Sequence, residues 1–409
     1  FFEPYALNRY SVIYSNGISA DLAPEQVVVS GDGESVTLNG LIANQSNVFV
    51  NATAKKVSVL SKKKNYIRSE KLEIANSANS ALATDSGLTQ NNFYGLRIED
   101  REISLNVPDV NKVIAIYESV DSGSVILDRL TFGSGLSLDT ASILGEKIIG
   151  QGSGAVGQVV TRSSSTEVEF VYLNANRFSP NESVTFEESN IRSSILTVSK
   201  GTYVDKTNDY VLDKGQRDQY YDYSRIVRKS DFYIPSRRLT IIYDYYQVPS
   251  SDSGDVYTVN SYGTERYGKD IPLLSGNVRA TDTLDFRPRV ASFTSITASP
   301  FVFASRDFSA VGANSSLVIA PNESFNVGYS YYLPRIDKVV LKKDGEVSLI
   351  RGVASSNPVE PTSIDESMDL GTIELPAYLY NPDDAKITLT NNKRYTMQDL
   401  RELEDRIEN

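Results

Sequence analysis

Apolar and polar residues alternate over much of this 409-residue chain. In the segment SNVFVNATAKKVSVL, for example, Val48, Val50, Ala52 and Ala54 occupy every second position. A period of two places successive side chains on opposite faces of a β-strand, and polar turns separate the runs. The pattern therefore predicts an antiparallel β-domain over residues 1–135, with a polar loop or weak helix over residues 76–92.

Residues 136–201 form a block of different composition, in which the segments GEKI and NESVTF each have the pattern of a turn followed by a strand. A small β-barrel inserted into the larger domain explains both segments, because the second segment supplies the returning half of the barrel. We therefore predict a small inserted β-module over residues 136–201.

Tyrosines crowd together after residue 202, and RRLTIIYDYYQV over residues 237–248 has the composition of a strong strand. Tyrosines on a half-buried sheet face need only packing, with their hydroxyls reaching water or backbone groups. A sugar-binding aromatic platform is the functional alternative, although Trp, the usual residue for stacking on sugars, is absent. We predict a Tyr-rich β-domain over residues 202–356, in which packing is the favoured role of the tyrosines.

The chain changes character near its end. Residues 357–394 are rich in Pro and acidic residues, and they fit an extended connector around one strand. Residues 395–409 predict the start of an amphipathic helix, for which Thr396 is a good N-cap and Asp399 completes an approximate capping box. Its apolar stripe, spaced by three, three and four residues, consists of Met397, Leu400, Leu403 and Ile407.

Such a stripe is typical of a coiled coil or helical bundle, so it is the candidate oligomer interface. The sequence begins with Phe1 rather than Met and stops inside the helical pattern, so we expect both ends to be cuts through a longer chain. The fold class that follows is mainly β. It comprises several antiparallel β-sandwich or small-barrel domains and a C-terminal helix that begins a coiled coil or helical bundle.

Composition excludes several chemistries. The chain contains no Cys and no His, which excludes disulfides, thiolate nucleophiles, histidine general bases and zinc sites built from these residues. The net charge of −11 argues against a broad nucleic-acid surface, and the basic run SKKKNY over residues 61–66 is interpreted as a solvated loop. No apolar run reaches the ~18 residues of a membrane span, so we expect no membrane insertion.

Three glycines at residues 152, 154 and 157 have the spacing G-x-G-x-x-G of a dinucleotide-binding loop. That mechanism needs a helix that opens on the glycines, because the helix N-terminus binds the pyrophosphate. The sequence that follows, QVVTRSSSTEVEFVYL, is typical of strand, turn and strand instead. We therefore interpret the run as a glycine-rich β-turn and predict no bound cofactor.

The segment TDTLDFRPRV brings two carboxylates close to two guanidinium groups, those of Asp282, Asp285, Arg287 and Arg289. Paired carboxylates can hydrolyse glycosides, but the general acid of that reaction needs a raised pKa. Ion pairing with arginine lowers a carboxylate pKa instead. We therefore predict a structural ion-pair cluster, and no catalytic or metal-binding residue.

Five longer strings occur in order along the chain: KGQRDQYYDYSRIVR, TDTLDFRPRV, GYSYYLPRIDKVVL, IELPAYLY and NNKRYTMQDLRELEDRIEN. Together they resemble the large virion structural proteins of contractile-tailed bacteriophages, notably cyanophages, over residues 25–409. The resemblance implies a non-enzymatic virion component, with the tail baseplate or tail fibre apparatus as the favoured location. It carries over no catalytic residue.

Three hypotheses follow. The leading one is a structural protein that forms a homo-oligomer, with a trimer favoured, and contacts other tail or baseplate proteins. The second is a receptor- or glycan-binding adhesin on the same particle, for which the module at residues 136–201 is the candidate and a host surface glycan the ligand. The third is an enzyme that uses Asp or Glu chemistry in a cleft, which no sequence signal supports.

Overall fold

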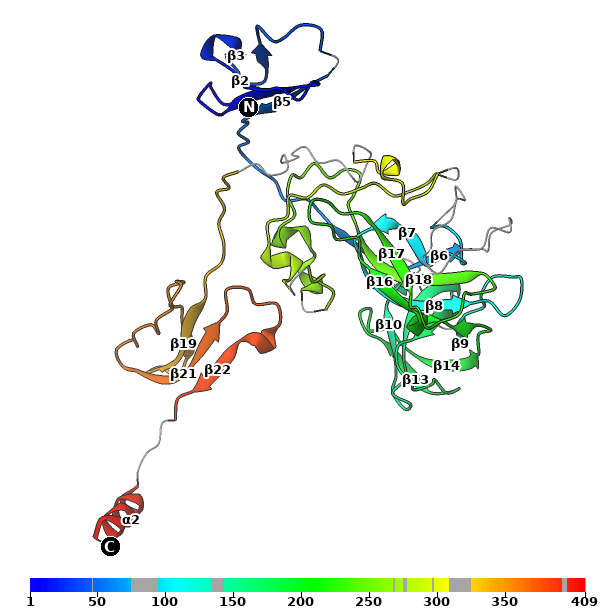
Figure 1. Cartoon of the computed structure of the whole chain (residues 1–409). Coiled ribbons are helices and arrows are strands. Elements are labelled where there is room, and N and C mark those ends of the chain that lie inside the picture. Colours follow the sequence, from blue (N-terminus) through cyan, green and yellow to red (C-terminus); the bar gives the residue numbers. More distant parts are fainter. Residues whose placement is uncertain are drawn as a thin grey trace.

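The computed structural model is dominated by antiparallel β-sheets and ends in one short helix, α2 (Met397–Glu408). This confirms the predicted mainly β fold and its C-terminal helix. In Figure 1 an N-terminal unit, a central body and a C-terminal sheet are distinct masses, with α2 at the far end. The residues that the structure describes are 1–45, 47–74, 95–133, 138, 143–267, 269–274, 278–295, 298–308, 325–391 and 396–408.

Two small sheets with strand orders β2-β1-β5 and β3-β4 make up the N-terminal unit. Alternate residues of the first strand, Tyr10, Val12 and Tyr14, are buried against Leu22 and Val27, as a period of two requires. The elements are β1 (Tyr10–Tyr14), β2 (Ser19–Asp21), η1 (Pro24–Gln26), β3 (Val27–Val29), β4 (Val36–Leu38) and β5 (Val48–Ala52).

A β-sandwich forms the centre of the body, with strand orders β15-β8-β18-β6 in one sheet and β16-β17-β7 in the other. Apolar side chains of both sheets share one core, in which Ile103 and Ile226 of one sheet meet Ile241 of the other. The elements are β6 (Asn65–Ile74), β7 (Glu102–Pro108), β8 (Val110–Glu118), β15 (Val204–Asp205), η2 (Thr207–Asp209), β16 (Tyr210–Asp213), β17 (Tyr223–Arg228) and β18 (Leu239–Gln247).

A closed six-stranded barrel with the order β10-β11-β12-β9-β14-β13 packs against the sandwich. Gly157 allows the close packing of its interior, since a Cβ there would lie 2.6 Å from the ring of Phe170. Val160 and Val171 of the barrel join a cluster with Ile242 of β18. The strands are β9 (Asp128–Phe132), β10 (Lys147–Gly150), β11 (Val156–Ser164), β12 (Glu167–Tyr172), β13 (Ser183–Phe186) and β14 (Arg192–Ser199).

β18 is therefore covered on both sides, by the second sheet of the sandwich on one face and by the barrel on the other. All of its residues except the last are buried, including Tyr243, Tyr245 and Tyr246. These three tyrosines pack in the interior, so they form no exposed aromatic platform for sugars.

The strand pairing differs from the predicted domain ranges. β6, β7 and β8 lie within the predicted domain 1–135, but they pair with strands of the predicted domain 202–356, so one sandwich is built from both ranges. β9 starts at Asp128 and closes the barrel predicted for 136–201, so the barrel begins earlier than predicted. Composition alone carries no information about such long-range pairing. The predicted loop over 76–92 lies outside the described residues.

Beyond β18 the body continues mainly as irregular chain with short 3-10 turns. They are η3 (Val259–Ser261), η4 (Thr264–Arg266), η6 (Ala280–Asp282) and η7 (Phe303–Ser305). The turn η3 lies between Tyr257 and Tyr262, and both of these tyrosines are buried in the body.

The C-terminal sheet has the strand order β20-β19-β21-β22 and stands apart from the body in Figure 1. It draws β19 and β20 from the predicted Tyr-rich domain and β21 and β22 from the predicted connector over 357–394, which thus contains two strands rather than one. The elements are β19 (Arg335–Lys342), β20 (Val347–Ile350), β21 (Ser367–Leu375), η8 (Pro382–Asp384) and β22 (Lys386–Leu389).

Candidate functional site

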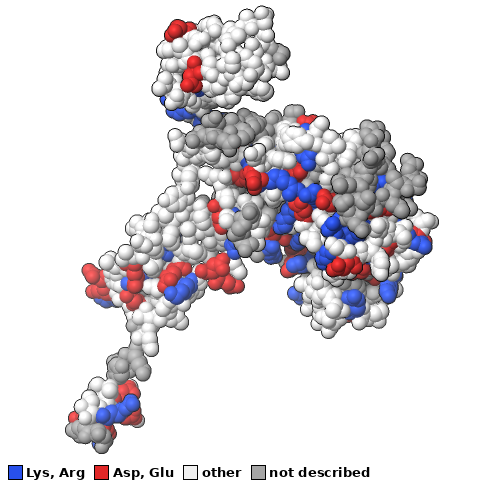
Figure 2. Space-filling model, in the orientation of Figure 1, with Lys and Arg blue, Asp and Glu red and all other residues white. Residues whose placement is uncertain are grey.

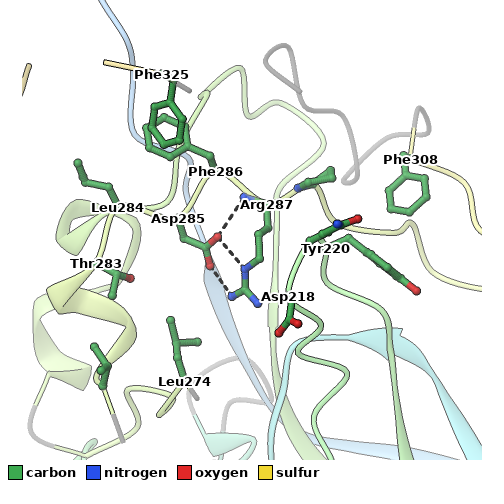
Figure 3. A pocket seen from close by; sticks show the side chains of 13 residues that line it. Asp218, Tyr220, Leu274, Thr283, Leu284, Asp285, Phe286, Arg287, Phe308 and Phe325 are labelled. Carbon is green, nitrogen blue, oxygen red and sulfur yellow. Dashed lines mark hydrogen bonds and ion pairs between the residues drawn. The ribbon is translucent and has the colours of Figure 1, made fainter. Parts of the chain in front are cut away.

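The pocket at the irregular side of the body has a volume of about 820 Å³. In Figure 3, Phe286 and Phe325 lie together at one end and Phe308 lies beyond Tyr220 at the other. Ring contacts hold both ends, since the centroids of Phe286 and Phe325 are 5.3 Å apart and those of Tyr220 and Phe308 are 5.7 Å apart. The remaining lining residues are Asp218, Gln219, Leu274, Val278, Thr283, Leu284, Asp285, Arg287 and Pro288.

The charged pair Asp285 and Arg287 lies between these two aromatic ends (Figure 3). The Arg287 guanidinium donates two bonds to the Asp285 carboxylate, from Nε at 2.9 Å and from Nη2 at 2.6 Å. The Tyr221 hydroxyl donates a third bond to the same carboxylate at 2.5 Å. The guanidinium also donates to the backbone oxygen of Arg217 and to the side chain of Gln216, so this pair is tied into the surrounding chain.

Electrostatics keep Asp285 ionised. Burial pushes the pKa of this carboxyl upward, but the hydrogen bonds and charge of Arg287, together with Tyr221, outweigh burial and lower the pKa below its usual value. A carboxyl held in this way does not supply a proton near neutral pH, which a general acid must do. The pair is therefore suited to fixing the pocket wall rather than to acid catalysis.

The other two predicted cluster residues lie elsewhere. Asp282, in η6, accepts hydrogen bonds from the hydroxyls of Tyr380 and Thr281. Arg289 is buried, donates to the backbone oxygen of Tyr246 at 2.7 Å, and has its Nη1 3.9 Å from the Asp109 carboxylate. From the predicted set the structure pairs Asp285 directly with Arg287, whereas Asp282 and Arg289 have other partners.

A second charged centre, which the sequence did not suggest, surrounds Lys64. Its Nζ lies 2.7 Å from the Asp109 carboxylate and donates to the Tyr262 hydroxyl at 3.1 Å. Aromatic rings enclose the ammonium at 4.3–5.9 Å from their centroids, those of Tyr221, Tyr246, Tyr257 and Tyr262. Aromatic faces attract a cation, so the rings and the carboxylate together compensate for its burial.

The predicted solvated loop over residues 61–66 is therefore wrong for two of its lysines. Lys62 and Lys64 are buried while Lys63 between them is exposed, because alternate residues of this extended segment face the interior. Burial lowers the pKa of Lys62, and the carboxylates of Asp252 and Asp255 oppose that shift. A local charge run gives no sign of these distant acidic partners.

A buried carboxylate also joins the barrel to the sandwich. Asp244 of β18 accepts hydrogen bonds from the backbone N–H of Ser69 at 2.7 Å and from the side chain of Gln158, a barrel residue, at 3.2 Å. Lys112 lies 3.3 Å from the same carboxylate and supplies the opposite charge. Each of these polar groups has a partner, so the contact fixes the two units against each other.

The glycine run at 152, 154 and 157 lies in and just after the turn between β10 and β11, as predicted for strand, turn and strand. The carboxylate of Glu182 accepts a hydrogen bond from the backbone N–H of Ser153 at 3.0 Å and a second from its hydroxyl. The turn thus already binds a negative group of the chain itself. Within the described residues, no group of three or more Asp and Glu side chains is arranged to hold a metal ion.

Nothing within the described part of the chain covers the predicted stripe of α2. Met397 and Ile407 are more than four-fifths exposed, and Leu400 and Leu403 are about half exposed. The predicted cap is formed, because Asp399 donates its backbone N–H to the Thr396 hydroxyl at 3.3 Å and accepts the Thr396 N–H at 2.7 Å. No helix within the described ranges is long and apolar enough to span a membrane.

Charge on the surface is mixed. Figure 2 shows Lys and Arg interspersed with Asp and Glu over the visible face of the central body. This agrees with the ion pairs that cross the body, such as that of Arg225 with Glu102 at 2.6 Å. The visible face offers no broad single-sign surface of the kind that binds a nucleic-acid backbone.

Comparison with known proteins gives one match. A family described as a domain of unknown function (DUF4815) matches residues 239–409. The matched range starts at the first residue of β18 and includes the 3-10 turns, the C-terminal sheet and α2. No curated protein and no solved structure matches the chain.

Proposed function

We propose that this chain is a non-enzymatic structural component of a phage virion that acts through homo-oligomeric interfaces. The open stripe of α2 is the observation that carries the proposal. An isolated helix of 12 residues is marginal in water, and four apolar side chains at coiled-coil spacing gain stability only when partner helices cover them. Copies of the same helix meet this need, with a trimer as the favoured state.

The chemistry of the pocket also favours a structural role. Its one buried carboxylate, Asp285, is held ionised by Arg287, and both groups are bonded to neighbouring residues. The buried charges around Lys64 and Asp244 likewise have partners, and they lie where segments distant in the sequence meet. Such contacts stiffen a body that presents interfaces.

The location in the particle comes from the sequence resemblance. The strings shared with virion proteins of contractile-tailed phages favour the tail baseplate or tail fibre apparatus, where other tail proteins are the expected partners. We would label intact virions with gold-conjugated antibody against residues 201–380 and view them by electron microscopy. Label at the tail end supports the proposal, and label on the head rejects the tail location. Absence of the protein from purified particles by mass spectrometry overturns the virion assignment.

The oligomeric part of the proposal has its own test. Replacing Leu400 and Leu403 together with Asp places two charges in the stripe, so we expect the mass of the chain by light scattering to fall to that of the monomer. Gln398→Asp, on the polar side of the same helix, is the matched control and should leave the mass unchanged. An unchanged mass of the double variant contradicts the coiled-coil interface.

A receptor- or glycan-binding adhesin is the second candidate, and the aromatic pocket favours it. Aromatic side chains at both ends and a few polar groups between them are typical of small-ligand sites. The pocket in the body, rather than the barrel, is therefore the candidate site for this function. Binding on a glycan array that Phe286→Ala abolishes would support this function, and a chain that binds no glycan on the array rejects it.

A further inference from the structure

The C-terminal sheet has one apolar face. Residues directly opposite each other on neighbouring strands share a face, and alternate residues of one strand do so as well. Val339 lies opposite both Leu349 and Gly371, and Gly371 lies opposite Leu389. Following this register across the sheet defines the apolar sheet face as Val339, Leu341, Val347, Leu349, Met368, Gly371, Ile373, Leu375, Ile387 and Leu389.

The opposite face is largely polar and is covered over its middle. Lys338 on that face lies 2.6 Å from the carboxylate of Glu360 and 3.2 Å from that of Asp369, and it donates to the Ser363 hydroxyl at 3.0 Å. The segment between β20 and β21 thus packs over this side, where Val340 is fully buried. The sheet has a second layer on its polar side only.

The apolar sheet face is open to water in the single chain. Val347, Ile387 and Leu389 are 59, 67 and 78% exposed, although they lie in regular strands. A sheet of this kind is stable when its apolar face packs against another layer. Neither the body nor α2 supplies that layer in this structure, as the exposure of these side chains shows.

We propose that the apolar sheet face packs against the same face of a second copy of this chain. Such a face-to-face contact has two-fold symmetry, so the proposal is a dimer at the sheet rather than the trimer favoured above. The inference rests on the proposed homo-oligomeric function and names a second surface for it. The face is suited to meet itself because it carries no unpaired charge. The charged residues at its end, Arg335 and Asp337, pair with each other at 3.0 Å, so two copies bring no like charges together.

Area supports a joint interface of sheet and helix. Four strands span about 19 Å and the strands run for about 14–31 Å, so the face covers roughly 400 Å². This is about half of the ~800 Å² that each partner contributes to a standard interface. α2 starts only seven residues after β22 ends and adds a stripe about 18 Å long. One neighbouring copy can cover both surfaces at once.

Two other ways of completing the C-terminal sheet fit the structure less well. The helix of the same chain is about 10 Å across, so it would cover about two of the four strands and leave the rest open. Addition of a strand to the sheet edge is disfavoured because the edge strands β20 and β22 are each only four residues long, and β22 carries Lys386. The broad face remains the surface that a second copy fits.

The absence of cysteine from the chain allows a direct test by cross-linking. Ile387→Cys and Val347→Cys each place a single thiol on the apolar sheet face, and Thr388→Cys places one on the opposite face of β22. With a short bismaleimide, we expect the full chain carrying either of the first two substitutions to form covalent dimers. The Thr388→Cys control should stay largely monomeric on a denaturing gel.

A charge test complements the thiol test. We expect the double substitution Ile387→Asp and Leu389→Asp to lower the mass by light scattering at least twofold, and Thr388→Asp to leave it unchanged. Peptide-level hydrogen exchange of β19 and β21 checks that the sheet itself still folds.

Three outcomes overturn the inference in different ways. If the sheet variants stay oligomeric while the α2 variant dissociates, the sheet face is no interface and the proposed function stands. If the unmodified chain is monomeric at every concentration, both fail. If Ile387→Cys combined with Leu403→Cys forms an intramolecular disulfide in a monomer, the chain's own helix is the cover.

Discussion

The barrel and the C-terminal sheet are both antiparallel, yet they differ in how many of their apolar side chains they bury. The barrel closes on itself through the pairing of β10 with β13, and 13 apolar side chains form its core. Within residues 335–389, all of which the structure describes, Val340 is the one buried apolar residue. A closed sheet has no free edge and no open face, so it completes itself within one chain. The open sheet leaves an apolar face exposed, which is the face proposed above to pack against a second copy.

This difference in closure explains why similar apolar residues are buried in the barrel but exposed in the C-terminal sheet. Barrel strands place Phe132, Phe170 and Phe186 in the interior, where the ring centroids of Phe132 and Phe186 are 5.9 Å apart. The C-terminal sheet has the same alternation, but its apolar side lies outside, as Ile387 and Leu389 show. Alternation therefore predicts which residues share a face, and closure decides whether that face is a core or an interface.

The largest effect should come from opening the closed unit. Phe170→Ala removes a fully buried ring from the barrel, and we expect a loss of about 3–5 kcal/mol in unfolding free energy. Hydrogen exchange of barrel peptides should then speed up by about a hundredfold or more. Ile387→Ala, measured at a concentration where the chain is monomeric, should cost less than about 0.5 kcal/mol.

Comparable losses from these two substitutions would mean that the sheet face is covered within one chain. That result would remove the distinction between a closed and an open unit.

A smaller loss of unfolding free energy is expected when a buried ion pair is broken, and almost none when an exposed pair is broken. Asp285→Asn leaves the partly buried Arg287 without its carboxylate, and we expect a loss of about 1.5–3 kcal/mol at pH 7. The folded pKa of Asp285 is lowered, since the bonds from Arg287 outweigh burial, so the stabilisation is present above the unfolded pKa of about 3.9. It is lost as the pH falls below that value. The difference between the unmodified chain and the variant, measured by urea unfolding, should therefore shrink below about pH 4.

The matched control lies in the open sheet. Lys343 and Glu366 are 3.2 Å apart but more than two-thirds exposed, so Glu366→Gln should change stability by less than about 0.5 kcal/mol. A difference for Asp285→Asn that grows as the pH falls would contradict the assigned ionisation of the Asp285–Arg287 pair.

The sequence predicts contacts between residues that are close together in the chain, and it misses contacts between residues that are far apart. The pair Asp285 and Arg287 is two residues apart, and the cap formed by Thr396 and Asp399 is three residues apart, so local pattern finds both. Strand character is also local, which is why the strand over 237–248 was predicted. Its neighbours β6 and β8 lie more than 100 residues upstream, and nothing in the composition indicates that pairing.

The same limit applies to the site. Lys64 meets Asp109 from 45 residues away and Tyr262 from 198 residues away, so its charge run looked like a solvated loop. Asp282 stands three residues before Asp285, yet its partner Tyr380 is 98 residues downstream. The sequence pattern identified Asp and Arg residues near the pocket. Which of them form ion pairs depends on tertiary contacts that the pattern does not show.

The smallest expected effect concerns the start of the open interface. Thr396→Ala removes the hydroxyl that accepts the Asp399 N–H, and loss of such a cap costs about 1 kcal/mol. Exchange of the α2 amides should then speed up about fivefold in the monomeric chain, with barrel amides unaffected. Thr390→Ala, before the helix, is the control.

If copies of α2 associate as proposed, raising the protein concentration should slow exchange in both the variant and the unmodified chain, because association stabilises the folded helix by mass action. Exchange that stays independent of concentration would show that α2 is not covered by a second copy.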